Sequence, residues 1–288
     1  MRFAFLASLF FLFPIIFSIP CSSIGVNGSV YSSITLTQDL ESTEDCLSIG
    51  ANNVTLDCAG HTLTGSRVGT GIRIFGRNGV DVRNCRVSNF NYGIYASLSD
   101  SSTIQWNTVT ECYIGIFTSS SSSISIDKNS VEKNGQGIYA YDLTDSSITG
   151  SRARESKGPG LELKSSFSDK IQGNDLSSNR VGLAISTSSE IEVLDNDLRG
   201  CYLGYQESGT RGVVFSGNAM DVLSGSAWDS LVSDIRSAVG LVIVLLLLSA
   251  LIFIIGKGKP REAADDKVKI DKFEAGDLER ERQMEENQ

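Results

Sequence analysis

A repeat of about 22 residues constrains this chain more than any other feature. One column of the repeat is glycine, at spacings of 22, 22, 22, 23, 22 and 22 residues: Gly71, Gly93, Gly115, Gly137, Gly160, Gly182 and Gly204. A second column keeps the same spacings and is mostly asparagine: Cys85, Asn107, Asn129, Ser151, Asn174, Asn196 and Asn218. Apolar residues hold the same register on either side of both columns. Self-similarity of this kind is the signature of a repeat architecture.

Each repeat contains three short stretches in which apolar and polar residues alternate, and none has the pattern of a helix. Alternation with a period of two is typical of strands. A single unit of this size cannot bury its apolar side chains alone, so the units must stack on one another. We therefore predict an all-β solenoid in which each repeat is one coil of a β-helix, rising ~4.8 Å, the spacing between neighbouring strands.

The two polar columns then have physical explanations. Stacked coils place the asparagines above one another at a bend, where their amides can bond to each other and to the backbone, as buried amides must. We expect Asn107, Asn129, Asn174, Asn196 and Asn218 to form this ladder. We expect the repeat glycines to supply backbone conformations that other residues cannot adopt, at the next bend.

Two segments carry a resemblance to a known family. They are NNVTLDCAGHTLTG (52–65) and GTGIRIFGRNGVDVRNCRVSNFNYGIY (69–95). They resemble the opening of right-handed parallel β-helix repeat proteins, which include archaeal membrane-anchored surface proteins, NosD-like proteins and carbohydrate-binding and sugar-hydrolase groups. The resemblance implies a right-handed parallel β-helix of about eight to nine coils, with a cap and first coil at residues 24–65 and the repeats at residues 66–222. The fold hosts lyases, hydrolases, adhesins and structural spikes, so it does not settle function.

Apolar runs at the two ends predict export and anchoring. Residues 1–23 are typical of a secretory signal peptide, although their apolar run is near the minimum length of a span and an uncleaved anchor is the alternative. The run AVGLVIVLLLLSALIFII predicts a transmembrane helix at residues 237–256. Basic residues follow it, so the positive-inside rule puts the charged tail, residues 257–288, in the cytoplasm. We therefore expect a single-pass cell-membrane protein whose β-helix is extracellular, with a linker at residues 223–236.

Six cysteines in an exported chain predict disulfides. Cys46 and Cys58 flank the first coil, and we expect them to bond to each other. A Cys58–Cys85 bond is the alternative. Cys21 is expected to leave with the signal peptide.

The charge and the glycosylation sequons limit the classes of partner that this chain is expected to have. The formal net charge is −9, and no basic patch suits nucleic acid. Sequons at Asn27 and Asn53 permit N-glycosylation. Nothing in the sequence indicates an oligomeric state.

The NosD-like resemblance implies a role with copper, for instance as an accessory to a metalloenzyme. The residues argue against this role, because His61 is the only histidine and Met220 is the only methionine between the two apolar runs. Soft or imidazole-rich sites need more ligands. We predict no metal site and no cofactor, and a structural role for His61 in the cap.

Carboxylates that could hydrolyse a sugar are scarce. Asp175 and Asp197 each follow the asparagine column on adjacent coils, ~5 Å apart, with Arg152 one coil earlier. That separation suits a retaining glycosidase. The alternative is that both are solvated surface charges or a casual calcium contact. A lyase would require several acids around calcium and a nearby base, and the sequence shows no such cluster.

The column two residues after each repeat glycine predicts a surface with binding character. It reads Arg73, Tyr95, Phe117, Tyr139, Glu162, Ala184 and Gln206. Its neighbours in sequence are expected to point inward, so these side chains point outward, with Tyr141 beside Tyr139. Exposed aromatic faces flanked by polar groups can hold sugar rings. The alternative is an aromatic ladder that only stabilises the sheet.

The sequence thus favours a membrane-anchored extracellular β-helix that binds envelope polysaccharide or another surface protein and is not an enzyme. The ligand contacts would be Tyr95, Phe117, Tyr139, Tyr141 and Glu162. A polysaccharide lyase or glycoside hydrolase is the first alternative, and a NosD-like accessory protein is the second.

Overall fold

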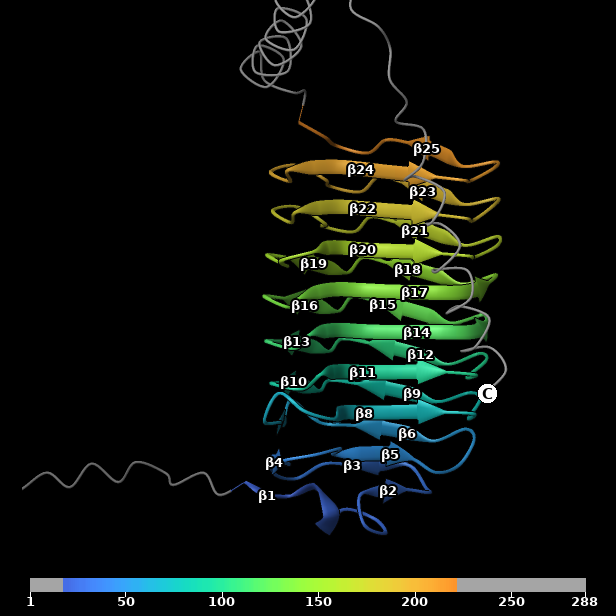
Figure 1. Cartoon of the computed structure of the whole chain (residues 1–288). Coiled ribbons are helices and arrows are strands. Elements are labelled where there is room, and N and C mark those ends of the chain that lie inside the picture. Colours follow the sequence, from blue (N-terminus) through green and yellow to red (C-terminus); the bar gives the residue numbers. More distant parts are fainter. Residues whose placement is uncertain (1–17, 222–288) are drawn as a thin grey trace, which may run out of the picture. The chain divides into compact units, whose positions relative to one another are not determined.

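A computed structural model describes residues 18–221 of the 288-residue chain (Figure 1). The coils contribute strands to three parallel sheets, which we call sheets A, B and C, and the last two coils contribute to sheets B and C only. Sheets B and C each hold nine strands, so the solenoid has about nine coils. The predicted right-handed parallel β-helix is confirmed.

From β1 to β21 the strands follow one another around the coils as A, B, C, and from β22 onward they alternate between B and C. Sheet A consists of β1 (Ile19–Pro20), β4 (Leu40–Glu41), β7 (Thr62–Thr64), β10 (Arg86–Ser88), β13 (Thr108–Thr110), β16 (Ser130–Glu132) and β19 (Arg152–Arg154). Sheet B consists of β2 (Ser29–Val30), β5 (Leu47–Ile49), β8 (Thr70–Phe75), β11 (Tyr92–Ser97), β14 (Ile114–Ser122), β17 (Gln136–Thr144), β20 (Pro159–Lys164), β22 (Val181–Ser186) and β24 (Leu203–Ser208). Sheet C consists of β3 (Ile34–Thr35), β6 (Thr55–Asp57), β9 (Asp81–Arg83), β12 (Thr103–Gln105), β15 (Ser125–Asp127), β18 (Ser147–Thr149), β21 (Lys170–Gln172), β23 (Glu192–Leu194) and β25 (Val214–Ser216). A 3-10 turn, η1 (Cys21–Ser23), lies in the first coil.

The register explains why the sequence repeats. Ile94 of β11 pairs with Ile116 of β14, and Ile116 pairs with Ile138 of β17. All three side chains are fully buried. Stacking one residue type over itself builds a continuous apolar column, and the hydrophobic effect stabilises it because each coil hides the apolar face of the next. In Figure 1 the coils stack in sequence order, and the strands of sheet B form one long face.

A buried amide ladder runs beside this core. The Asn174 amide donates to Oδ1 of Asn196 (3.0 Å) and to the carbonyl of Ile148 (2.8 Å), and Asn196 repeats the pattern with Asn218 and Ile171. Asn174 and Asn196 are each 1% exposed. Each side chain therefore satisfies backbone groups at a bend that strand pairing leaves open.

The explanation expected for the repeat glycines is wrong. None of the seven has a positive φ. They lie within or at the start of the sheet B strands, where a Cβ on Gly115 would overlap Cγ1 of Val131 and lie 2.8 Å from the carbonyl oxygen of Gly137. At six of the seven positions, all except Gly204, an added Cβ would lie within 3.0 Å of a neighbouring atom, so the coils pack too closely there for a side chain. Left-handed backbone instead occurs one residue before each ladder position, for example at Gly173 (φ 65°).

The predicted disulfide pairing is also wrong. Cys46 bonds to Cys21, and Cys58 bonds to Cys85, which was the alternative pairing. Cys21 is buried in the first coil, and β1 just before it pairs with β4. The folded region therefore begins by Ile19, and a cut after residue 23 would remove one partner of a disulfide.

The predicted ends lie mainly outside the described residues. These are most of the signal peptide (residues 1–17) and the linker, transmembrane helix and charged tail (residues 223–288). Between residues 18 and 221 there is no helix of the length and apolarity that a membrane span needs.

Candidate carbohydrate-binding face

Three aromatic side chains from successive coils lie side by side on the outer face of sheet B. Tyr95 of β11 pairs in register with Phe117 of β14, which pairs with Tyr139 of β17. The Tyr95 and Phe117 rings are stacked with centroids 5.1 Å apart, and the Phe117 and Tyr139 rings meet edge-on at 5.4 Å. All three are half-buried. We call Tyr95, Phe117 and Tyr139 the aromatic row.

The row is wider than the sequence indicated. Tyr92 meets both Tyr95 and Phe117 edge-on, each at 5.6 Å between centroids. It stands three residues before Tyr95 in β11, and neighbouring coils carry no aromatic residue at its position, so no column reveals it. Tyr141 follows Tyr139 by two residues and is 39% exposed. The face thus combines apolar ring surfaces with several phenol hydroxyls.

Opposite charges stand at the two ends of the row. The Arg73 guanidinium of β8 lies 6.0 Å from the centroid of the Tyr95 ring, a cation–π distance. At the other end Glu162 of β20 pairs with Tyr139 and accepts a 2.7 Å hydrogen bond from the Gln136 amide. Burial raises the pKa of Tyr139, and the Glu162 carboxylate raises it further. The Tyr139 hydroxyl therefore stays neutral and can donate a hydrogen bond.

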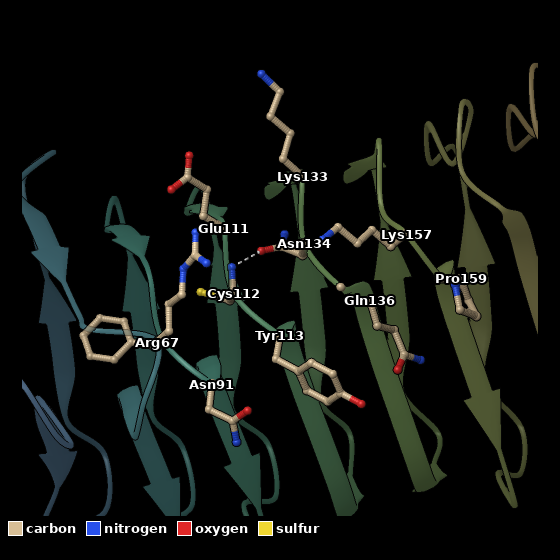
Figure 2. A pocket seen from close by; sticks show the side chains of 13 residues that line it. Arg67, Asn91, Glu111, Cys112, Tyr113, Lys133, Asn134, Gln136, Lys157 and Pro159 are labelled. Atoms are coloured by element: carbon tan, nitrogen blue, oxygen red, sulfur yellow. Dashed lines mark hydrogen bonds between the residues drawn. The ribbon is translucent and has the colours of Figure 1, made fainter.

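A cavity of about 850 Å³ adjoins the row at the bends that join sheet A to sheet B. The polar and charged residues important here are Arg67, Glu111, Tyr113, Lys133, Gln136 and Lys157. Figure 2 shows Tyr113 and Gln136 on the same side of the bends, and Lys157 reaching toward Asn134. The repeat columns do not reveal this cavity, because its residues come from the bends of five coils and the side chains differ from coil to coil.

A second polar ladder supports the cavity floor. The backbone N–H of Cys112 donates to Oδ1 of Asn134 (2.8 Å), and the Asn134 amide donates to the carbonyl of Val109 (3.0 Å). The dashed line in Figure 2 marks the first bond. Burial raises the pKa of the Cys112 thiol to about 11, so it is protonated and unreactive at neutral pH. Spacings of 22 and 23 residues from Cys112 through Asn134 to Ser156 and Asn179 could have predicted this ladder.

The candidate catalytic carboxylates lie elsewhere on the solenoid. Asp175 and Asp197 are partners across adjacent coils, in line with sheet A, and Arg152 is 3.5 Å from Asp175. The Arg199 guanidinium donates two hydrogen bonds to Asp197, of 2.8 and 2.6 Å, and the Arg199 backbone N–H donates a third of 3.1 Å. Those bonds hold the pKa of Asp197 below its ordinary value. This pair is in line with sheet A, whereas the aromatic row lies on sheet B, and the two sets of residues do not pair in register.

The residues that could ligate copper are scattered. His61 Nδ1 lies 3.1 Å from Oδ1 of Asp39 in the cap, and Met220 is 44% exposed in the last coil. Cys112 and Cys201 carry free thiols four coils apart. No group of three or more potential ligands gathers anywhere in residues 18–221. Copper has a strong preference for several thiolate, thioether or imidazole ligands, so the described residues do not fit a copper site.

Both predicted glycosylation sites lie in the first coils. Asn27 and Asn53 are exposed, each with a positive φ, at turns of the polypeptide. Their exposure leaves room for a glycan, and modification remains a prediction.

The comparison with protein families gives one match. A family model described as periplasmic copper-binding protein (NosD) matches residues 42–221, more than half of the chain. No curated protein matches the sequence.

Several solved structures share the fold at low identity. Tailspike protein 2 from Escherichia coli O157:H7 bacteriophage CAB120 has a TM-score of 0.50 and 13% identity, over 65% of this chain and 34% of that one. The AlgE6 A-module, a mannuronan C-5 epimerase of Azotobacter vinelandii, has a TM-score of 0.45 and 14% identity, over 66% of each chain. The periplasmic alginate epimerase AlgG has a TM-score of 0.48 and 14% identity, over 66% of this chain and 55% of that one. The chain spans less than two thirds of the length of each, and these likenesses concern the fold alone.

Proposed function

This chain belongs to the NosD family of parallel β-helix proteins, and we propose that it is an exported, membrane-anchored surface protein that binds envelope polysaccharide without catalysis. The observation that carries the proposal is the aromatic row, in which Tyr95, Phe117 and Tyr139 stand on one outer face of sheet B. A sugar ring has apolar faces and hydroxylated edges, so it matches half-exposed aromatic faces bordered by polar side chains.

Polar side chains at the edge of the aromatic row supply hydrogen-bonding groups, which the ring faces lack. Glu162 can accept hydrogen bonds from sugar hydroxyls, and the Tyr139 and Tyr141 hydroxyls can donate or accept them. Arg73 closes the other end of the row. Because the solenoid places equivalent positions at the ~4.8 Å strand spacing, the face suits an extended polymer better than a single sugar.

Export and anchoring rest on the two terminal apolar runs, and the two disulfides agree with an oxidising compartment. The copper named in the family description has no fitting residues between positions 18 and 221, so no step through copper belongs to the proposal. A role as accessory to a metalloenzyme would have to work without a metal bound to these residues.

A polysaccharide lyase or hydrolase is the main alternative, and Asp175 and Asp197 are the residues on which it depends. A retaining mechanism requires one carboxylic acid whose pKa is raised enough to protonate the leaving oxygen. Asp197 has the opposite shift, because Arg199 holds it ionised. These contacts favour binding over hydrolysis.

A glycan-array measurement on the full chain in detergent tests the proposal. We expect the wild-type protein to bind a set of polysaccharides, and the Tyr95→Ala/Phe117→Ala/Tyr139→Ala variant to lose that binding. Tyr202→Ala is the matched control, because Tyr202 is 88% exposed and lies outside the row. Absence of wild-type binding, or equal binding by the triple variant, would refute the proposal, and appearance of shortened glycans would refute its non-catalytic part.

A further inference from the structure

We propose that the cavity beside the aromatic row binds the acidic groups of a polyanionic polysaccharide, such as one built from uronic acids. This inference rests on the proposed function and names the class of polymer that the same face selects. It is carried by three cationic side chains that line one cavity, Arg67, Lys133 and Lys157.

The charge of the cavity contrasts with that of the chain. The whole chain carries a formal charge of −9. The cavity lining holds three cations and one carboxylate, Glu111, and is therefore net positive. A cationic hollow in an acidic protein attracts anions locally while the remaining surface repels them, which favours a bound polymer that presents its charges at this place.

The three cations are available to a ligand. All are exposed, and none of them forms a salt bridge within residues 18–221. By contrast, Arg83 and Arg199 are engaged by neighbouring aspartates. An unpaired cation can pair with a ligand carboxylate without first breaking an ion pair.

The spacing of the cations suits a polymer. Lys133 and Lys157 come from adjacent coils, since the backbone N–H of Lys157 bonds to the carbonyl of Asn134. Arg67 lies three coils before Lys133, ~14 Å away at the strand spacing. Arg67, Glu111 and Lys133 occupy the same left-handed position of the bend, with φ of 68°, 57° and 59°. Arg67 and Lys133 thus lie in line with the solenoid axis, with Glu111 between them, and can meet carboxylates about three coils apart on one extended chain.

The cavity and the aromatic row form a continuous surface. Asn91 lines the cavity, and the next residue, Tyr92, contacts the rings of Tyr95 and Phe117. Gln136 also lines the cavity and bonds to Glu162, the residue paired with Tyr139. In Figure 2 Asn91, Tyr113 and Gln136 point to the same side, away from Lys133 and Glu111. A sugar ring on the row therefore adjoins the Asn91 and Gln136 side of the cavity, and a polymer that also meets Lys133 must cross the bends.

The test compares an acidic with a neutral oligosaccharide. The full chain in detergent is titrated with hexagalacturonate and with the neutral maltohexaose, and the dissociation constants are measured by calorimetry. We expect tighter binding of hexagalacturonate. In the Lys133→Gln/Lys157→Gln variant the dissociation constant for hexagalacturonate should rise about 10-fold, which is the effect expected from losing two surface ion pairs. The dissociation constant for the neutral sugar should change less than about 2-fold. A higher salt concentration should weaken the binding of hexagalacturonate only, because salt screens the charges.

A charge-matched control separates the cavity from overall charge. The Lys128→Gln/Lys170→Gln variant removes two positive charges from the region of sheet C and should bind hexagalacturonate as the wild type does. Equal loss in both double variants, or no loss in the cavity variant, would overturn the inference. If neutral sugars bind through the aromatic row and acidic ones bind no better, the inference fails while the proposed function stands. If no sugar binds, both fail.

Discussion

Oδ1 of Asn129 accepts two hydrogen bonds from Asn107 on the previous coil, one from its amide nitrogen Nδ2 (3.1 Å) and one from its backbone N–H (3.0 Å). Asn129 also donates to the carbonyl of Ile104 (2.8 Å). One buried amide thus closes three hydrogen bonds that the strands leave open. The coil-to-coil spacing depends on such bonds as well as on apolar stacking.

Replacing Asn129 with alanine should destabilise the solenoid by about 2–4 kcal/mol, because it leaves buried donors of Asn107 unpaired and opens a small cavity. The midpoint of urea unfolding, followed by circular dichroism, measures the effect. Asn129→Ser should lose less stability, because serine already occupies this column at position 151. There the Ser151 Oγ accepts a hydrogen bond from the backbone N–H of Asn129. Equal loss in both variants would count against the ladder.

Replacing Gly115 with alanine should destabilise the fold more than replacing Gly173 with alanine. The Gly115 Cβ would meet Val131 and the backbone of Gly137, whereas nothing lies within 4 Å of a Cβ on Gly173. We expect Gly115→Ala to cost about 2–3 kcal/mol from overpacking, and Gly173→Ala about 1 kcal/mol from its positive φ. A reversed order of the two unfolding midpoints would contradict the packing explanation of the glycine column.

The disulfide pairing predicts how many thiols react in the unfolded chain. With Cys21–Cys46 and Cys58–Cys85 bonded, only Cys112 and Cys201 are free. Titration of the denatured, unreduced protein with a thiol reagent should therefore give two thiols per chain. A Cys46–Cys58 bond would instead leave Cys85 free as a third thiol, and Cys21 as a fourth where the chain retains it. Mass spectrometry of the mature N-terminus should find Cys21 retained.

Asp169 should make stability depend on pH near neutrality. It is 3% exposed, Oδ1 accepts the backbone N–H of Ser146 (2.7 Å), and no donor within residues 18–221 reaches Oδ2. Burial raises the pKa of Asp169 to about 7. The folded chain then holds this proton more tightly than the unfolded chain. The free energy of unfolding should therefore fall as pH rises from about 4 to about 7 and level off above.

Asp169→Asn removes that dependence while keeping the acceptor for Ser146. We expect it to raise the free energy of unfolding by about 1–3 kcal/mol at pH 8 and to have little effect at pH 4. Asp142→Asn, at an exposed carboxylate, is the control. A gain that is the same at both pH values would show that the charge of Asp169 is not the cause.

The repeat predicted the parts of the fold that recur at fixed spacing. Ile104 and Ile126 are buried in register, Asn129 and Asn174 lie in the amide ladder, and the aromatic row faces outward, because in a solenoid spacing along the sequence becomes position in space. The ladder through Asn134 has the same spacing and is equally visible in the sequence.

What does not recur could not be predicted in this way. The disulfides span 25 and 27 residues, in the first coils where the 22-residue spacing fails. The role of the glycine column depends on how closely Gly115 approaches Val131, which spacing does not reveal. The cavity depends on the side chains of Arg67, Lys133 and Lys157 at bends where each coil carries a different residue.

The most direct test of the central claim is a calorimetric titration of the full chain with the glycan that the array ranks first, comparing wild type with Phe117→Ala and Phe117→Tyr. Phe117 is the middle ring of the aromatic row and contacts Tyr92, Tyr95 and Tyr139. We predict that alanine raises the dissociation constant about 10-fold or more, as truncation of a central aromatic contact does, and that tyrosine preserves binding. Unchanged affinity in Phe117→Ala would contradict the assignment of this face as the binding site.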